Sequence, residues 1–344
     1  MRKLIMGSGQ DEEKKENGSR GDVNYQERKP RPSMSSINQT MIEGFILKGV
    51  SNVPELQVFL FLLVLLIYLM SLIGNLTIIL LVCFDLHLHT PMYFFLFNLS
   101  VIDVSSSTTT LHNIFVVFIS QKRMVSTFAC MSQAYIFCLL TSNEISILAA
   151  MSFDRYVAIC RPLHYHTVMS WRLCGLLASI SWGFGIVEMV PILVFISRFT
   201  CYISKEINHY FCDVLPIRDI TCSDTSSLDL YILITGNANI FILLFLTITS
   251  YVFIIACILR ISSSAGRRKA FYTCSSHITV VVIFYSSIVL QYIVTVSGKN
   301  MGSNLVFSLF NTAIVPMMNP LIYSLKNKDV KSALQRKLKI CERK

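Results

Sequence analysis

Residues 58–84 read VFLFLLVLLIYLMSLIGNLTIILLVCF, an uninterrupted stretch without Asp, Glu, Lys or Arg. A helix needs about 20 predominantly apolar residues to cross a bilayer core of roughly 30 Å, so this stretch indicates a membrane span. Six further stretches meet the same criterion: 91–118, 127–159, 173–197, 230–259, 270–298 and 301–325. The sequence therefore predicts an all-α membrane protein, a bundle of seven transmembrane helices.

The composition agrees with this prediction. Hydrophobic residues make up 53% of the chain and charged residues only 15%, whereas charged residues are about 25% of an average soluble domain. Within the predicted spans the acids and bases are few, and the last three spans have none. The exceptions are Asp103 in span two, Glu144 and the Asp154-Arg155 pair in span three, and Glu188 in span four.

Lys and Arg lie asymmetrically around the spans, and basic residues in short loops stay on the cytoplasmic side. They gather after span three, before span six and after span seven, at Arg161, Arg172, Arg260, Arg267, Arg268, Lys269, Lys326, Lys328, Lys331, Arg336, Lys337 and Lys339. We therefore expect an extracellular N-terminus and a cytoplasmic C-terminus. The net charge of +10 then faces membrane lipid and cytoplasmic partners, and it does not indicate nucleic-acid binding.

These limits predict three regions: an extracellular N-terminal segment (1–56), a seven-transmembrane domain (57–326) and a short basic cytoplasmic tail (327–344). Residues 1–36 are polar and have no apolar periodicity, so we expect most of the first region to be disordered. Met1 and Met34 are both candidate start residues. The Asn-Gln-Thr triplet at Asn38 is the favoured glycosylation site, because other matches such as Asn75 lie within spans.

The predicted topology sorts the eleven cysteines. Cys130, Cys201, Cys212 and Cys222 fall on or near the outer side, where disulfides form, and four cysteines allow three pairings. We expect two disulfides there. The cysteines within the spans are interpreted as small buried apolar residues, and the scattered spacing does not favour a zinc site.

Two carboxyl groups, Asp103 and Glu144, lie at mid-depth on neighbouring predicted spans. Ionisable groups in a membrane are costly and mark functional sites, and two carboxylates side by side repel each other unless they share a proton or hold a cation. Asn75, Ser107 and Asn319 have further oxygens to offer. We favour a bound sodium ion as the one non-protein component, and the alternative is a pair of neutral carboxyl groups hydrogen-bonded across helices.

The inner ends of spans three and seven carry a second set of polar residues. Asp154-Arg155-Tyr156 ends span three, where an Arg side chain can reach water and pair with the neighbouring carboxylate. Pro320 interrupts span seven one turn before Tyr323, and proline removes a helix hydrogen bond and frees a backbone carbonyl. The pattern predicts a hinge at this point.

Long ordered motifs give this chain a family resemblance: LHTPMYFFL (88–96), MSFDRYVAIC (151–160) with PLHY (162–165), SY (250–251), KAFYTCSSH (269–277) and PMMNPLIYSLKN (316–327). The chain resembles vertebrate odorant receptors, within the rhodopsin-like class of G-protein-coupled receptors, from about Asn38 to Lys331. Ser152-Phe153 stands where the family more often has Ala-Tyr, and Tyr272 where it has Ser. Neither difference removes a charged or hinge residue.

The resemblance implies a function that the topology alone does not. It implies a plasma-membrane receptor, expected in sensory cilia, that binds a small odorant and activates a stimulatory, olfactory-type G protein to raise cyclic AMP. The residues that match the family's coupling and switch positions are Asp154, Arg155, Tyr156, Tyr251, His277, Asn319, Pro320 and Tyr323. The resemblance also implies the disulfide pairs Cys130–Cys212 and Cys201–Cys222.

Helical spacing places candidate ligand residues on common stripes, and the resemblance turns these stripes toward one cavity. They are Phe137, Cys138, Thr141 and Ser142 in span three, Thr235 and Asn239 in span five, and Tyr285, Ile288, Val289 and Tyr292 in span six. The alternative for each is plain helix packing. Because no Asp or Lys lies on these stripes, we expect a neutral ligand.

Other functional classes fit less well. A transporter usually shows repeated halves, a channel needs a filter or a pore-lining ring, and the seven histidines form neither a metal cluster nor a catalytic triad. We therefore expect no enzyme activity. The nearest competitor is a related chemosensory receptor that acts outside the olfactory epithelium.

Overall fold

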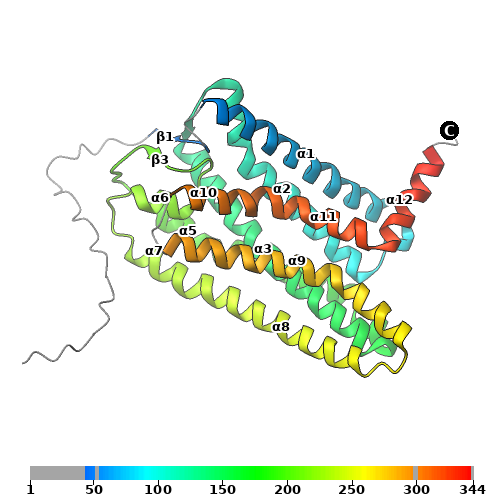
Figure 1. The fold of residues 1–344 in the computed structure, drawn as a ribbon. Helices are drawn as coiled ribbons and strands as arrows, with labels where there is room; N and C mark the ends of the chain where they lie inside the picture. Colours follow the sequence, from blue (N-terminus) through cyan, green and yellow to red (C-terminus); the bar gives the residue numbers. More distant parts are fainter. Residues whose placement is uncertain (1–42, 51–53, 297–300, 342–344) are drawn as a thin grey trace, which may run out of the picture. The chain divides into compact units, whose positions relative to one another are not determined.

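The structure, a computed structural model, describes residues 43–50, 54–296 and 301–341. Seven helical rods lie side by side in it (Figure 1): α1 (Pro54–Phe84), α2 (Pro91–Ser120), α3 (Thr127–Cys160), α5 (Trp171–Ser197), α7–η4–α8 (Ser226–Tyr231, Ile232–Gly236, Asn237–Leu259), α9 (Ser264–Val296) and α10–η5–α11 (Met301–Leu309, Phe310–Ile314, Val315–Lys326). The predicted seven-helix bundle is thus confirmed, with ends within a few residues of those expected. Asn38, Met1 and Met34 lie outside the described residues.

Six of the described rods are long and apolar enough to cross a membrane. The remaining rod, α2, has a similar length, but Asp103 and the Ser/Thr-rich run 105–110 interrupt its apolar sequence. Asp103, Ser107 and Thr110 are nevertheless buried. The polar face of α2 is turned into the bundle, so its outer surface remains compatible with lipid.

Local signals explain where several rods begin. Thr90 precedes α2, and Pro91 takes the first helical position, where its missing N–H costs nothing. Ser126 caps α3, its Oγ accepting a hydrogen bond from the Ala129 N–H at 3.3 Å. Ser170 caps α5 in the same way, its Oγ accepting a hydrogen bond from the Leu173 N–H at 3.4 Å. Each cap satisfies one of the N–H groups that a helix start leaves free.

The central rod is α3, which packs against α2, α5, α8 and α9. Its fully buried Ile147 and Leu148 join the main apolar core with Phe95 and Leu99 of α2. The outer surfaces of the rods are also apolar. Large side chains such as Phe245, 69% exposed, have no cover within the described chain, which is what a lipid-solvated surface requires.

Three short strands add to the predicted all-helical fold: β1 (Gly44–Leu47), β2 (Met124–Ser126) and β3 (Glu206–Ile207). They form one sheet in the order β2–β1–β3, antiparallel between β1 and β2 and parallel between β1 and β3. The sheet lies at the end of the bundle opposite α12 (Figure 1). Part of the N-terminal segment 1–56 is therefore ordered, and the disorder expected for residues 1–36 falls outside the described residues.

The tail forms a helix, α12 (Lys328–Cys341), which leaves the end of α11 at an angle (Figure 1). Asp85, in the turn before η2 (Leu86–Leu88), accepts hydrogen bonds from the Arg336 guanidinium of α12 at 2.8 and 3.1 Å. These bonds hold the pKa of the Asp85 carboxyl at about 2. The remaining short helices are η3 (Pro162–His164), α4 (Tyr165–Val168) and α6 (Val214–Ile220).

Candidate functional site: a polar core and the two ends of the bundle

The predicted hinge in α11 is anchored by a side chain from α1. Because Pro320 has no N–H, the carbonyl of Pro316 loses its helical partner. The fully buried Asn75 supplies a replacement, with Nδ2 donating to the Pro316 oxygen at 2.9 Å. Gly74 allows this approach, since a Cβ there would lie 2.9 Å from the Pro320 ring. The freed carbonyl is therefore satisfied from outside its own helix.

One turn along α11, Asn319 reaches the carboxyl group of Asp103 on α2. Its Nδ2 lies 3.1 Å from Oδ1 and 3.0 Å from Oδ2. Two buried oxygens, Glu144 Oε1 and Asn75 Oδ1, have no hydrogen-bond partner within the described residues. Carboxylate and amide oxygens are hard ligands that suit sodium, so the residues present fit the predicted ion.

Arg155 at the end of α3 is held by its neighbour. Its Nε donates to Asp154 Oδ2 at 3.0 Å, and a second guanidinium nitrogen contacts the same oxygen. Tyr165 of α4 donates to the other Asp154 oxygen at 2.8 Å. Both side chains of the pair are more than nine-tenths buried. The Arg155 charge is thereby satisfied locally, by the neighbouring carboxylate.

The other predicted switch residues surround this pair. Tyr251 of α8 and His277 of α9 are hydrogen-bonded through the Tyr251 hydroxyl and Nδ1. Tyr323 of α11 is fully buried, and its hydroxyl has no partner in the described part of the chain. Tyr156 packs against the rings of Phe153 and Phe253. A buried hydroxyl without a hydrogen-bond partner is unfavourable, so a movement that gave the Tyr323 hydroxyl a partner would lower the free energy.

A wide hollow opens beside these residues, between α2, α3, α9 and α12. Its volume is about 2120 Å³ with the open space in front of it included, and its lining includes Arg155, Arg268, Lys269, Tyr272 and Asn327. Arg268 and Lys269 add positive charge beside Arg155, which is paired with Asp154, and the acidic Asp329 also lines the hollow. The hollow lies at the end of the bundle that the basic residues predict to be cytoplasmic, and it suits a protein segment with acidic or carbonyl groups.

At the opposite end, the loop from 198 to 225 covers the bundle. The structure joins Cys130 to Cys212 and Cys201 to Cys222, the pairs implied by the resemblance. Phe211, beside the first disulfide, packs edge-on against Phe137 with ring centroids 4.9 Å apart. The first ligand candidate of α3 is therefore in contact with the loop.

Within this loop, Tyr210 reaches α10 and η5. Its hydroxyl lies 3.2 Å from Ser308 Oγ and 2.7 Å from Thr312 Oγ1. Burial lowers the pKa of the neighbouring His209 to about 4, so its imidazole is neutral at physiological pH. The loop is thus fixed to spans three and seven at once.

The remaining ligand candidates are dispersed. The hydroxyls of Thr141 and Thr235 donate hydrogen bonds to backbone carbonyls one turn earlier in their own rods. Cys138 is partly buried beside α5. Tyr285 and Ile288 pack in the main core, whereas Val289 is 45% exposed, on the face of α9 that carries Val282. The side chain of Tyr292 lies outside the described part.

Ser142 and Asn239 come together around a residue that the sequence analysis passed over. Ser142 Oγ donates to Glu188 Oε2 at 2.7 Å, and Asn239 Nδ2 lies 3.1 Å from the same oxygen. Glu188 is buried, with only 7% of its surface exposed. The sequence did indicate a special role for Glu188, because it is the one charged residue in span four. Its contacts to α3 and α8 depend on the tertiary fold and could not be predicted.

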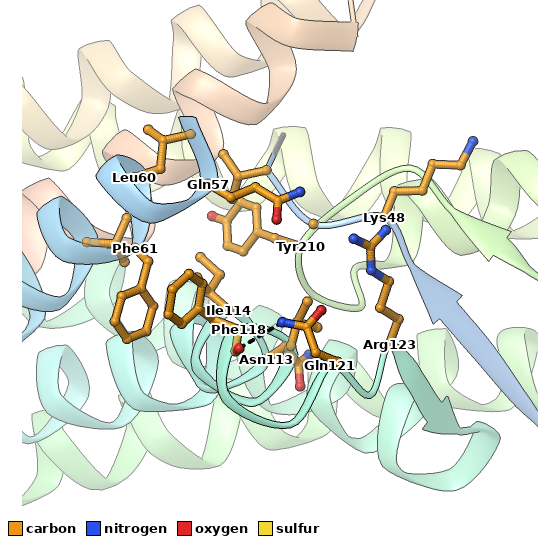
Figure 2. A pocket seen from close by; sticks show the side chains of 14 residues that line it. Lys48, Gln57, Leu60, Phe61, Asn113, Ile114, Phe118, Gln121, Arg123 and Tyr210 are labelled. Carbon is orange, nitrogen blue, oxygen red and sulfur yellow. Dashed lines mark hydrogen bonds between the residues drawn. The ribbon is translucent and has the colours of Figure 1, made fainter. Parts of the chain in front are cut away.

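Figure 2 shows another hollow, between the ends of α1 and α2. Lys48 and Arg123 stand at one side of it, and Phe61 and Phe118 at the other, with Tyr210 behind them. Lys48 is paired with Glu206 at 3.1 Å. None of the predicted ligand residues lines this hollow.

Comparison with known proteins agrees with the fold. A solved structure, that of squid rhodopsin, superposes with a TM-score of 0.66 over 85% of this chain and 88% of its own, at 18% identity. The fold is therefore that of a seven-helix receptor of the rhodopsin type.

Closer relatives are found among curated sequences. The chain is 41% identical to mouse olfactory receptor 8A1, covering 89% of this chain and 99% of the relative. It is 44% identical to mouse olfactory receptor 8G50, covering 88% and 97%. The olfactory receptor family profile matches residues 64–341. The chain belongs to the olfactory receptor family.

This membership confirms the main functional prediction in its general form. The protein is a multi-pass membrane receptor for odorants that acts through a G protein, and it is a signalling protein, not an enzyme.

Proposed function

We propose that this receptor binds a small, neutral, volatile ligand among the outer halves of its helices and activates a stimulatory, olfactory-type G protein. Cyclic AMP then rises, in the sensory cilia. The coupling half of this proposal is supported by the hollow beside Arg155, because the Arg268 and Lys269 side chains that line it and its position at the end of α11 suit a docking segment of a G protein.

Activation follows from differential affinity. An agonist shifts the equilibrium only if it binds the open arrangement more tightly than the closed one. In the closed arrangement, Arg155 is paired with Asp154, and the Tyr323 hydroxyl has no partner. Movement of α11 about Pro320 would give Tyr323 a polar partner and widen the hollow. The extracellular N-terminus and cytoplasmic C-terminus are part of the same proposal.

The test is cyclic AMP production in cells that express the receptor with trafficking factors, against a panel of volatile compounds. We expect a dose-dependent rise that Arg155→Ala abolishes at equal surface staining. Trp171→Phe, a change on the exposed surface near the same end, is the control and keeps the response. A response that survives in Arg155→Ala would contradict the coupling mechanism.

We also propose that Asp103 and Glu144, with oxygens of Asn75, Ser107 and Asn319, hold a sodium ion. The partnerless oxygens of Glu144 and Asn75 support this proposal. A bound sodium ion would offset one of the two negative charges, reduce the repulsion between the carboxylates and stabilise the packing of α2, α3 and α11. Ligand potency should fall as sodium rises, and Glu144→Gln should remove that dependence; an unchanged sodium response in the variant would reject the site.

A further inference from the structure

A long groove on the outer surface of the bundle runs between α5 and α8, with α3 as its floor. It occupies about 2400 Å³ with the open space before it included, and most of its lining is apolar. Val187 and Pro191 line it from α5, and Ala238 and Ile242 from α8. Because the groove opens on the lipid-facing surface of the bundle, a molecule dissolved in the bilayer can enter it from the side.

Glu188 and Asn239 also line this groove. Two side chains, Ser142 and Asn239, donate hydrogen bonds to the carboxyl group of Glu188. Asn239 Nδ2 donates to Ser142 Oγ at 3.2 Å, and Ser142 Oγ donates in turn to Glu188 Oε2 at 2.7 Å. The second carboxyl oxygen, Oε1, has only the long 3.4 Å contact with Asn239 among the described residues. Since a carboxylate offers about four acceptor positions, Oε1 retains capacity for a further donor.

A second acceptor lies next to Glu188 in the chain. Pro191 stands inside α5 and has no N–H, so the carbonyl of Val187, four residues earlier, lacks its helical hydrogen bond. The carbonyl of Glu188 itself is used, because the Tyr231 hydroxyl donates to it at 2.8 Å. This part of the groove thus has two acceptors with unused capacity, Glu188 Oε1 and the Val187 carbonyl. The neighbouring donors, Asn239 Nδ2 and the Tyr231 hydroxyl, already make hydrogen bonds.

We propose that this groove is a lateral ligand site, and that its ligand is a neutral aliphatic alcohol whose hydroxyl donates to Glu188 Oε1. The alkyl chain lies along the apolar surface formed by Val187, Pro191, Ala238 and Ile242. The inference deepens the proposed function, on which it rests for the claim that occupancy leads to signalling, since Asn239 and Ser142 are among the predicted ligand residues.

The chemistry of the site favours a hydroxyl over other head groups. An ether or ketone of the same length has no hydrogen to donate, so it leaves Glu188 Oε1 unsatisfied. An alkylammonium ion would gain an ion pair with Glu188, but it would have to leave water and enter a groove open to hydrocarbon, and we expect this desolvation cost to exceed the gain from the pair. A hydrogen bond to a charged acceptor corresponds to about 10- to 100-fold in affinity, and this is the discrimination we expect between an alcohol and its methyl ether.

The test measures binding directly and does not depend on signalling. The purified receptor in nanodiscs is labelled with a ten-carbon primary alcohol that carries a photoreactive diazirine, and the labelled peptides are identified by mass spectrometry. We expect labelling of α5 and α8 around Pro191 and Ala238, competed by 1-decanol about 10- to 100-fold more effectively than by its methyl ether. Glu188→Gln should reduce labelling by a similar factor.

Two further variants keep the test decisive. Ala238→Trp fills the groove from an exposed position without touching the Glu188 bonds, so it should abolish labelling even if Glu188→Gln folds poorly. Glu206→Gln makes the same chemical change on the exposed loop surface and should label as the wild type does. Equal competition by alcohol and ether, unaltered labelling of Ala238→Trp, or stronger competition by decylamine would each overturn the assignment. Labelling without a cyclic AMP response would instead reject the signalling part of the proposed function and leave the site intact.

Discussion

Replacement of Asn75 by Ala tests how the α11 hinge is held together. The change removes the donor that satisfies the Pro316 carbonyl, and a buried carbonyl without a partner costs about 1–3 kcal/mol. The truncated side chain leaves a small cavity, which adds about 1 kcal/mol. The bond to the Ser71 carbonyl, 3.0 Å long, contributes little because that carbonyl already accepts within α1. We therefore expect a loss of about 2–4 kcal/mol, or roughly 5–10 °C in the thermal unfolding midpoint.

The assay is thermal unfolding of the purified receptor in nanodiscs, arranged as a double-mutant cycle with Pro320→Ala. Alanine at position 320 restores an N–H for the Pro316 carbonyl, so Asn75→Ala should cost about 1–2 kcal/mol less in that background. Asn237→Ala is the matched control, because that amide donates only to Leu233 in its own helix, at 2.7 Å. It should shift the midpoint by no more than about 1–2 °C. Strict additivity of Asn75→Ala and Pro320→Ala would refute the idea that Asn75 replaces the missing proline N–H.

Three other outcomes follow from the structure. Arg336→Ala should destabilise the receptor at pH 7 by about 1 kcal/mol, a modest figure because Arg336 is half-exposed. Since the pKa of Asp85 is lowered to about 2, the stabilisation by this ion pair is complete above about pH 4 and disappears toward pH 2. The thermal midpoints of the variant and the wild type should therefore converge toward pH 2. Protonation of His209, whose pKa is lowered to about 4, should reduce stability as the pH falls from about 6.5 to 4, and His209→Phe should flatten that part of the midpoint profile. Gly74→Val should lower surface expression and cost about 1–3 kcal/mol through its clash with Pro320, whereas Gly183→Val, where a side chain would meet nothing, should be tolerated.

The sequence was sufficient for the helices because membrane spans are defined locally. A span needs only its own length and apolarity, so the long stretches with few or no charges located all seven rods. The break at Pro320 was equally local, since it depends on one missing N–H. What the sequence could not give was the partner of the freed Pro316 carbonyl, because Asn75 lies 241 residues away and only the packing of α1 on α11 brings it there.

The candidate site divides in the same way. Asp103 and Glu144 could be recognised as costly charges within spans, but the partner of each depends on helix rotation. Rotation also decides that Glu188 contacts Ser142 and Asn239, and that Val289 is exposed. Apolar periodicity does not fix rotation well in a membrane, because the lipid-facing and core-facing surfaces are both apolar. The short strands were missed because each pairs with a distant segment of the chain.

The carboxyl groups of the bundle differ in what their partners leave available, and this difference decides their roles. Asp103 receives both contacts from the Asn319 amide, on the hinge helix itself, so any movement of α11 must exchange those bonds. Glu188 receives its contacts from α3 and α8, and none of its described bonds reaches α11. A ligand bound at Glu188, as proposed, would therefore act on the hinge indirectly, through Ser142 and the α3 helix that continues to Glu144 and Arg155. Because α3 is the rod that contacts both regions, a change in its position is the shortest physical connection between the groove and the hollow beside Arg155.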